Sequence, residues 1–194
     1  MNKTKIAIFA SGAGSNAVKL IEYFKEHSSI EVAMVLSNKI DAKIMTTASD
    51  MGIRTVFRDN HFVADGRQLS AFMEENAIEW IVLAGYLRLI PGELVEAYPG
   101  RIINIHPALL PNYGGKGMYG TNVHRAVLEN KEKESGITIH FVNTKFDDGT
   151  ILAQFRCPVD PGDTPESLYS KIQYLEHNYF PVVIEKTLLN PLYA

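Results

Sequence analysis

The sequence predicts an α/β fold, and three observations support this prediction. Short runs rich in β-branched and aromatic residues alternate with stretches of helical periodicity over roughly the first half of the chain. Two more β-rich runs follow each other directly after residue 130, and a long helical stretch comes last. Strand–helix alternation implies right-handed crossovers and a parallel sheet covered on both faces. We therefore expect a Rossmann-like, mostly parallel twisted sheet with helices on both faces, an antiparallel C-terminal strand pair and a long C-terminal helix.

The elements of the first half follow from their residue patterns. Strands are expected at residues 5–10, 32–37, 54–57, 80–84 and 101–106, where apolar residues run almost without interruption. Helices are expected between them, with examples at residues 16–27, 42–51 and 67–76. No repeat, linker or low-complexity segment interrupts this order, so we expect residues 1–194 to form a single domain.

The second half predicts a hairpin and a capped helix. Strands at residues 136–143 and 150–159 are joined by Phe-Asp-Asp-Gly, a turn that makes the pair antiparallel. A helix is then expected from Thr164 to about residue 188, with Thr164 as N-cap and Pro165 in the first turn. Pro181 should kink or divide this helix, because proline lacks the N–H that a helix interior requires.

Composition limits the classes of function. The chain has 194 residues, 46% of them hydrophobic, and a net charge of −3 without a run of like charge. A nucleic-acid or membrane surface is therefore not expected, and the apolar run at residues 6–10 is too short for a signal peptide or membrane helix. One cysteine, Cys157, excludes an intrachain disulfide and a cysteine-based zinc cluster. The histidine spacing fits no metal motif, so we expect a cytoplasmic protein that uses no metal.

Asn104-Ile-His106-Pro107 is the most informative motif. Asn104 and His106 are two residues apart in a predicted strand, so their side chains emerge on the same face. An amide and an imidazole at the carboxyl end of a strand can polarise a carbonyl group and move a proton. The motif therefore favours an enzyme.

The loop after the first strand predicts an anion site. Gly12, Gly14 and Ala17 fit the dinucleotide pattern, but the second strand ends in Ser-Asn-Lys and lacks the acidic residue that holds a ribose. Free N–H groups at a helix start, with Ser15 and Asn16 as further donors, instead suit a single phosphate. A glycine turn that serves only strand–helix packing is the alternative.

Other polar residues leave alternatives open. In the Phe-Asp-Asp-Gly turn, one carboxylate could face His106 and hold its ring protonated or in a fixed tautomer, although acidic residues are also common in turns. Among the remaining histidines, His140 is expected to be packed in a strand, and His27 and His61 to lie at the surface. His124 and His177 are candidates for a site.

Four motifs together resemble the 10-formyltetrahydrofolate-dependent formyltransferases: Ser-Gly-x-Gly-Ser-Asn, Val-Leu-Ala-Gly-Tyr-Leu-Arg-Leu-Ile, Asn-Ile-His-Pro-Ala-Leu-Leu-Pro and Phe-Asp-Asp-Gly. The likeness runs from about residue 5 to residue 188, and the first loop is similar to that of the phosphoribosylglycinamide branch in purine biosynthesis. The resemblance implies 10-formyltetrahydrofolate as co-substrate, phosphoribosylglycinamide as formyl acceptor, and a monomer or homodimer.

The resemblance also implies residue roles. It makes Asn104, His106 and Asp147 the catalytic trio, with Asp147 rather than Asp148 as its aspartate. The residues implied for phosphoribosylglycinamide are Gly14, Ser15, Asn16, Gln173 and Glu176. Those implied for the folate are Arg67, Leu87, Arg88, Leu89, Ile90, Asn104, Asn143, Thr144, Lys145, Phe146 and Asp147.

One segment departs from the family pattern. Residues 112–122 form a longer glycine-rich loop, and Asn122 stands where the family often has a histidine. This loop could be a flap over the site or a surface excursion without a role. Functional alternatives are a related folate-dependent N-formyltransferase acting on another amine, and a non-catalytic nucleotide-binding module. The tRNA-formylating and hydrolytic relatives are expected to need further domains beyond these residues.

Overall fold

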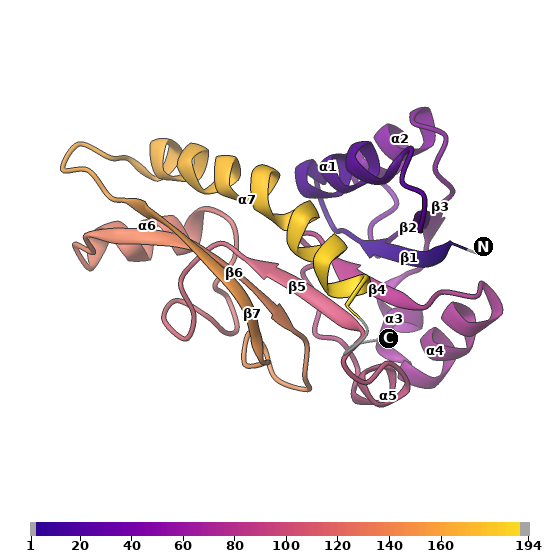
Figure 1. Ribbon diagram of the computed structural model, residues 1–194. Coiled ribbons are helices and arrows are strands. Elements are labelled where there is room, and N and C mark those ends of the chain that lie inside the picture. Colours follow the sequence, from indigo (N-terminus) through magenta and orange to yellow (C-terminus); the bar gives the residue numbers. More distant parts are fainter. Residues whose placement is uncertain (1–2, 191–194) are drawn as a thin grey trace.

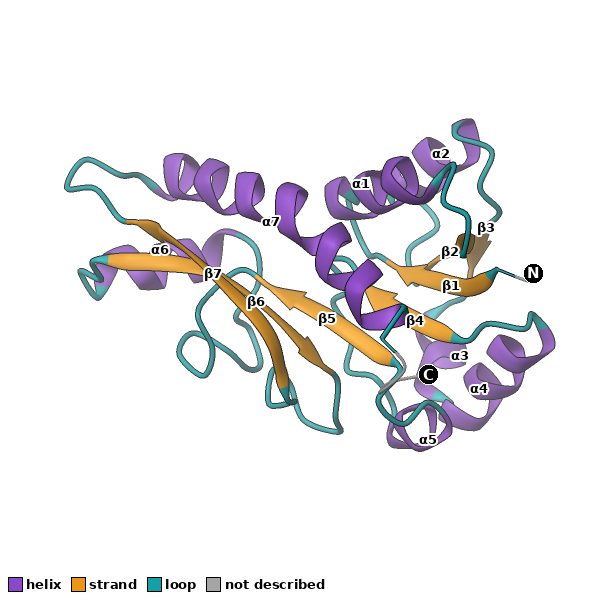
Figure 2. Cartoon of the chain, in the orientation of Figure 1, coloured by secondary structure: helices purple, strands orange, loops and turns teal. Residues whose placement is uncertain are grey.

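One seven-stranded sheet runs through the protein, which a computed structural model describes over residues 3–190 (Figures 1 and 2). The strands are β1 (Thr4–Phe9), β2 (Ile30–Ser37), β3 (Thr55–Phe57), β4 (Trp80–Leu83), β5 (Ile102–His106), β6 (Glu134–Phe141) and β7 (Ile151–Pro158), in the spatial order β3-β2-β1-β4-β5-β6-β7. The first five pair in parallel, whereas β6 is antiparallel to both β5 and β7. The predicted mixed sheet is confirmed.

Helices cover both faces of the sheet (Figure 1). They are α1 (Ser15–Phe24), α2 (Lys43–Asp50), α3 (Asn60–Ala64), α4 (Gly66–Glu75), α5 (Gly92–Ala97), α6 (Thr121–Glu129) and α7 (Pro165–Leu188). Alternate residues of β1 enter two separate cores: Ile8 packs with residues of α1, α2 and α7, and Phe9 with residues of α3, α4 and α5. This alternation follows from the two-residue period of a strand and explains why β1 is apolar almost throughout.

The C-terminal helix α7 begins as predicted. Thr164 accepts a hydrogen bond from the backbone N–H of Ser167 at 3.2 Å, and the Ser167 hydroxyl accepts one from the backbone N–H of Thr164 at 2.9 Å. Of the two expected effects of Pro181, a kink or a division, the division does not occur, since one helix runs from Pro165 to Leu188. Pro181 and its neighbours Phe180 and Ile184 are buried, and this packing holds the helix together across the missing hydrogen bond. No helix within the described residues is long and apolar enough to cross a membrane.

The strand order fixes where a ligand can bind. From β1 the chain winds outward to β2 and β3, and then returns to β4 on the other side of β1. The loops that follow β1 and β4 therefore leave the sheet in opposite directions, which opens a crevice at the carboxyl ends of these strands. The loop before α1 and the end of β5 both lie at this edge.

Candidate active site

A cavity of about 950 Å³ lies at this edge of the sheet. Its walls come from residues 12–16 after β1, residues 83–91 after β4, residues 104–107 at the end of β5, and residues 115–120 of the glycine-rich loop. The rest of the lining comes from the β6–β7 turn, from Ala64 of α3, His124 of α6 and His140 of β6, and from Tyr169, Ile172 and Glu176 of α7. Segments far apart in the sequence thus share one cavity, as expected for a site at a topological switch point.

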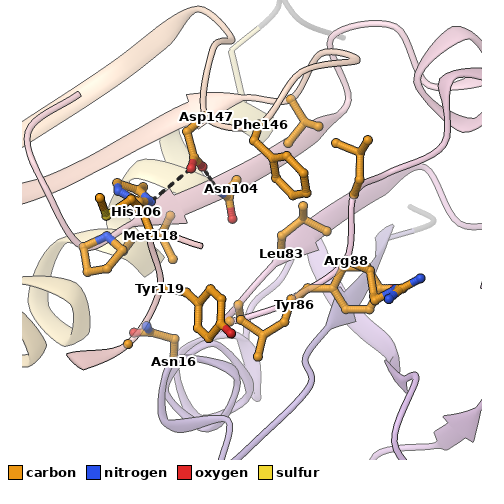
Figure 3. A pocket seen from close by; sticks show the side chains of 18 of the residues that line it. Asn16, Leu83, Tyr86, Arg88, Asn104, His106, Met118, Tyr119, Phe146 and Asp147 are labelled. Atoms are coloured by element: carbon orange, nitrogen blue, oxygen red, sulfur yellow. Dashed lines mark hydrogen bonds and ion pairs between the residues drawn. The ribbon is translucent and has the colours of Figure 1, made fainter. Parts of the chain in front are cut away.

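Asn104, His106 and Asp147 meet at one end of the cavity (Figure 3). The Asp147 carboxylate lies between the other two side chains, with Oδ1 at 3.4 Å from Asn104 Nδ2 and Oδ2 at 3.5 Å from His106 Nδ1. Asp148 is exposed and instead accepts a hydrogen bond from Asn143 Nδ2 at 3.2 Å. Of the two turn carboxylates, Asp147 is therefore the one that faces His106.

The pKa of His106 is set by opposing influences. Burial lowers the pKa of its ring, and the charge of Asp147 and the carbonyl of Tyr113 raise that pKa by less. Asp147 thus shifts the ring pKa in the expected direction, but burial outweighs it. His106 Nε2 lies 2.8 Å from the carbonyl oxygen of Tyr113. Because a carbonyl oxygen only accepts, Nε2 carries a ring proton, and whenever the ring is neutral its lone pair is on Nδ1, the atom that faces Asp147.

Asp147 remains an anion in this arrangement. Burial raises the pKa of its carboxyl group, but this is outweighed by three neighbours that lower it: His140, whose Nε2 lies 3.8 Å from Oδ1, His106, and the backbone N–H of Gly115. Its backbone adopts the left-handed conformation, with φ 52°. Aspartate tolerates this conformation better than most residues, so the turn can aim the carboxylate back into the cavity.

His140 belongs to this polar group, a role that the sequence did not reveal. It is buried in β6, directly opposite Asn104 in the β5–β6 register, and its Nε2 lies 3.1 Å from Asn104 Nδ2. Its Nδ1 lies 2.8 Å from the carbonyl oxygen of Phe141, so Nδ1 donates and Nε2 can accept from Asn104. His140 is packed, as expected, but it also orients the Asn104 amide.

Of the remaining histidines, one lines the cavity and the others lie outside it. His124 lines the cavity, and burial and the charge of His106 lower its pKa. His177 does not line the cavity. His27 is half-buried, with Nε2 at 3.1 Å from Glu185, and His61 is exposed. In the described part of the chain, no group of three or more His, Cys, Asp or Glu residues is arranged to hold a metal.

The predicted anion loop lies at the start of α1. Gly14 is the N-cap, with φ 72°, and no side chain caps the first turn. A Cβ at this position would lie 2.6 Å from the Ile44 side chain, so both conformation and space require glycine. The free N–H groups of the first turn can therefore receive an anion.

Glu176 of α7 reaches the same loop. Asn16 donates from Nδ2 to Glu176 Oε2 at 2.9 Å, across 160 positions of the sequence. Burial raises the pKa of the Glu176 carboxyl group to about 7, and the hydrogen bond from Asn16 lowers it by less. Near neutral pH, the Glu176 carboxyl group beside the anion loop can therefore be present in either its protonated or its ionised form.

The opposite wall of the cavity is apolar. Leu87, Leu89 and Phe146 are large hydrophobic residues that line the cavity and remain 44%, 46% and 41% exposed. In Figure 3, Phe146 and Leu83 lie on the same side of the trio, and Arg88 points away from it. Exposed apolar side chains around a cavity suit a flat, largely apolar ligand.

Three residues implied by the resemblance do not line the cavity. Arg67 is exposed in the first turn of α4, and Thr144 is exposed in the β6–β7 turn. Gln173 donates from Nε2 to the hydroxyl oxygen of Tyr169, a lining residue, at 2.8 Å. The other implied residues line the cavity.

The glycine-rich loop is part of the site. Residues 115–120 line the cavity, and the backbone N–H of Gly115 donates to Asp147 Oδ2 at 2.9 Å. In Figure 3, Tyr119 of this loop lies between Asn16 and Tyr86. Asn122, at the position of the family histidine, is outside the lining, with Nδ2 at 3.3 Å from the carbonyl oxygen of Gly117. The loop is therefore a wall of the cavity and not an unrelated surface excursion.

Comparison with known proteins decides the family, because the formyl transferase model matches residues 4–184. The chain belongs to the formyl transferase family. It is 42% identical over 188 residues to the chloroplastic phosphoribosylglycinamide formyltransferase of Arabidopsis thaliana, covering 94% of this chain and 64% of the relative's length. The phosphoribosylglycinamide formyltransferase of Bacillus subtilis is 36% identical over 189 residues, which is 95% of this chain and 94% of that protein.

A solved structure shows the same fold for the family. The phosphoribosylglycinamide formyltransferase of Bacillus halodurans superposes with a TM-score of 0.87 at 34% identity, over 97% of this chain and 98% of the other. The seven-stranded mixed sheet and the long C-terminal helix are therefore the family's architecture. The likeness covers every strand that builds the cavity.

Proposed function

We propose that this chain transfers the formyl group of 10-formyltetrahydrofolate to the amino group of phosphoribosylglycinamide, a step in purine (IMP) biosynthesis. One observation carries the proposal: Asn104, His106 and Asp147 meet in a cavity that also contains an uncapped helix start and an apolar wall. The names of the Arabidopsis and Bacillus relatives support the choice of acceptor.

The proposed reaction begins when the acceptor amine attacks the formyl carbon. A new C–N bond forms and the carbonyl oxygen becomes an oxyanion. We propose that Asn104 Nδ2 stabilises this oxyanion by donating a hydrogen bond to it. This nitrogen donates to Asp147 at 3.4 Å and faces His140 at 3.1 Å, and the oxyanion would replace the longer of these contacts. Hydrogen-bond donors aimed at a developing oxyanion lower the barrier of acyl transfer.

We assign the proton transfer to His106. Its neutral ring has the lone pair on Nδ1, which can accept the proton that the amine loses. The resulting imidazolium would lie between the Asp147 carboxylate and the Tyr113 carbonyl, and both stabilise a cation. When the bond between the formyl carbon and N10 breaks, the ring returns the proton to N10. Formylated acceptor and tetrahydrofolate leave, and no covalent enzyme intermediate or metal takes part.

The remaining residues bind the two substrates at a distance from the reacting atoms. Gly14, Ser15 and Asn16 would hold the phosphate, and Gln173 and Glu176 would contact the glycinamide. Residues 87–90 and 143–147 would enclose the pteridine, with Arg67 near the folate tail. Anchoring both substrates at remote points aligns amine and formyl carbon, which is how binding energy lowers the barrier of a two-substrate reaction.

The proposal also covers the oligomeric state, the domain organisation and the cellular compartment of the protein. We propose that the chain acts as a monomer or a homodimer. Strands from both halves of the sequence build one sheet, which supports a single formyltransferase domain over residues 1–194. We place the reaction in the cytoplasm, as expected for water-soluble substrates and a free thiol at Cys157.

A spectrophotometric assay tests the proposed function. Purified protein is mixed with 10-formyl-5,8-dideazafolate and phosphoribosylglycinamide, and deformylation is followed by absorbance. Turnover that requires both substrates supports the proposal. Turnover with water or an amino sugar in place of phosphoribosylglycinamide would instead favour a related enzyme. Nucleotide binding without any turnover would favour a non-catalytic module.

A further inference from the structure

The backbone of the glycine-rich loop contacts two members of the trio at its first turn. We infer that Tyr113-Gly114-Gly115 is a clamp that fixes the ring of His106, and that Glu132 is a positioning residue because it holds Tyr113 in place. The kinetic part of this inference depends on the proposed function. The structural part does not, because it concerns only the orientation and tautomer of a buried imidazole ring.

The clamp contacts are shorter than the direct contact between His106 and Asp147. The Tyr113 carbonyl oxygen lies 2.8 Å from His106 Nε2, and the Gly115 N–H lies 2.9 Å from Asp147 Oδ2. His106 Nδ1 and Asp147 Oδ2 are 3.5 Å apart. The two clamp distances, 2.8 and 2.9 Å, are within the usual range for N–H···O hydrogen bonds, whereas the 3.5 Å between His106 Nδ1 and Asp147 Oδ2 is longer than that range. Three consecutive residues therefore position both partners.

Tyr113 adopts a backbone conformation that needs support. Its φ is 58°, in the left-handed region that tyrosine rarely occupies. Two contacts support it: its ring packs against the core that includes α7, and its hydroxyl donates to Glu132 Oε1 at 2.7 Å. Glu132 lies between α6 and β6, outside the cavity. The residue whose carbonyl contacts His106 is thus held by a carboxylate outside the cavity lining.

Gly114 closes the clamp against Asp147. A Cβ at this position would lie 2.6 Å from Leu110 Cδ2 and 3.2 Å from Asp147 Cβ. A side chain there would displace the end of the Leu110 side chain and press on Asp147. The segment is therefore matched to Asp147 by close packing as well as by hydrogen bonds.

The clamp has a chemical consequence. While Tyr113 accepts from Nε2, the neutral ring keeps its lone pair on Nδ1. If the carbonyl moved away, the ring could carry its proton on Nδ1 and donate it to Asp147. That tautomer has no lone pair on the atom to which we assign the proton transfer. Loosening the clamp should therefore lower kcat and leave both KM values nearly unchanged.

Two pairs of variants test the inference in the whole chain. Tyr113→Phe removes the hydroxyl that Glu132 holds, and Tyr174→Phe, at a 67% exposed tyrosine outside the cavity, is its control. Glu132→Ala removes the acceptor, and Glu132→Gln keeps one and should restore most of the activity. We expect Tyr113→Phe and Glu132→Ala to lower kcat about tenfold, the usual scale for groups that orient a catalytic side chain.

The decisive measurement is the ¹⁵N spectrum of His106, which reports the tautomer and the pKa of its ring. We expect the Nε2–H tautomer in the wild type and in Tyr174→Phe, and a mixture of tautomers in Tyr113→Phe and Glu132→Ala. An unchanged tautomer in both of the latter variants would overturn the inference, whatever happens to kcat. A chain without formyltransferase activity would refute the proposed function, and the spectrum would still decide the clamp.

Gly114→Ala provides an independent test, because it acts through packing and not through Tyr113. It should also mix the tautomers of His106, since its methyl group would push the loop away from Asp147. Gly162→Ala is the matched control, because a Cβ there meets nothing within 4 Å. A Gly114→Ala protein that unfolds cooperatively and keeps the wild-type tautomer would count against the clamp.

Discussion

The two ends of the cavity are built in opposite ways. At one end, His106, His124 and His140 are at most 4% exposed, and the trio is connected by hydrogen bonds to His140, Tyr113 and Gly115. At the apolar end, which starts at Phe146 beside Asp147, the side chains of Leu87, Leu89 and Phe146 are between 41% and 46% exposed and still have apolar surface to bury.

This difference separates two tasks. Buried polar groups with fixed partners are already in position before a ligand arrives, so they can stabilise charge without reorganising. Exposed apolar groups gain free energy only when a ligand covers them, which supplies affinity. Substitutions at the polar end should therefore change the rate, and substitutions at the apolar end should change binding.

The largest effect is expected for His106→Ala at the polar end. Removing a general base or an oxyanion donor typically costs a factor of 10²–10⁴, so we expect kcat to fall about 10³-fold. Binding of a folate analogue, measured by titration calorimetry, should change little, because the apolar wall is intact. His61→Ala, at an exposed histidine outside the cavity, is the control. If binding fell as much as kcat, the two ends would not be separate.

The next effect concerns Glu176 and the pH dependence of stability. Burial raises its pKa from 4.5 to about 7, so the folded protein holds this proton more tightly than the unfolded chain does. The contribution to stability is fully present below pH 4.5 and is lost as the pH rises to about 7. A shift of this size corresponds to about 3 kcal/mol, as an order of magnitude.

Urea unfolding at pH 4.5 and pH 8 measures this contribution. Glu176→Gln keeps a neutral group of the same shape, so its stability relative to the wild type should rise by that amount between the two pH values. His106 and His124, whose pKa values burial lowers, act in the opposite direction below pH 6.5, but they are present in both proteins and cancel in the difference. A constant difference between the two proteins would mean that Glu176 is ionised throughout this range.

The sequence predicted some features of the polar end and of the fold but not others. Strand periodicity placed Asn104 and His106 on one face, because side-chain alternation is a local property. The place of His140 depends on the register of β5 against β6, and no local pattern carries that register. The continuity of α7 through Pro181 depends likewise on burial of Phe180 and Ile184, which is a tertiary effect.

The electrostatics of the site could likewise be predicted only in part from the sequence. The Phe-Asp-Asp-Gly turn predicted a carboxylate near His106, and the structure has Asp147 there. The sign of the pKa shift of His106 could not be inferred, because it depends on how fully the ring is buried. The clamp contact from Tyr113 was also unpredictable, since it comes from a backbone carbonyl and not from a side chain.

The smallest effect is expected at the apolar end, for Phe146→Ala. A folate ring on this wall would cover much of the 41% of Phe146 that is exposed, and losing part of a buried aromatic contact costs on the order of 1–2 kcal/mol. KM for the folate should therefore rise about tenfold, with kcat and the free energy of unfolding almost unchanged. Phe57→Ala, at a 36% exposed phenylalanine outside the cavity, is the matched control. Steady-state kinetics with varied folate measures the difference. A fall in kcat with an unchanged KM would place Phe146 with the trio, because its neighbour Asp147 depends on the same turn for its left-handed backbone.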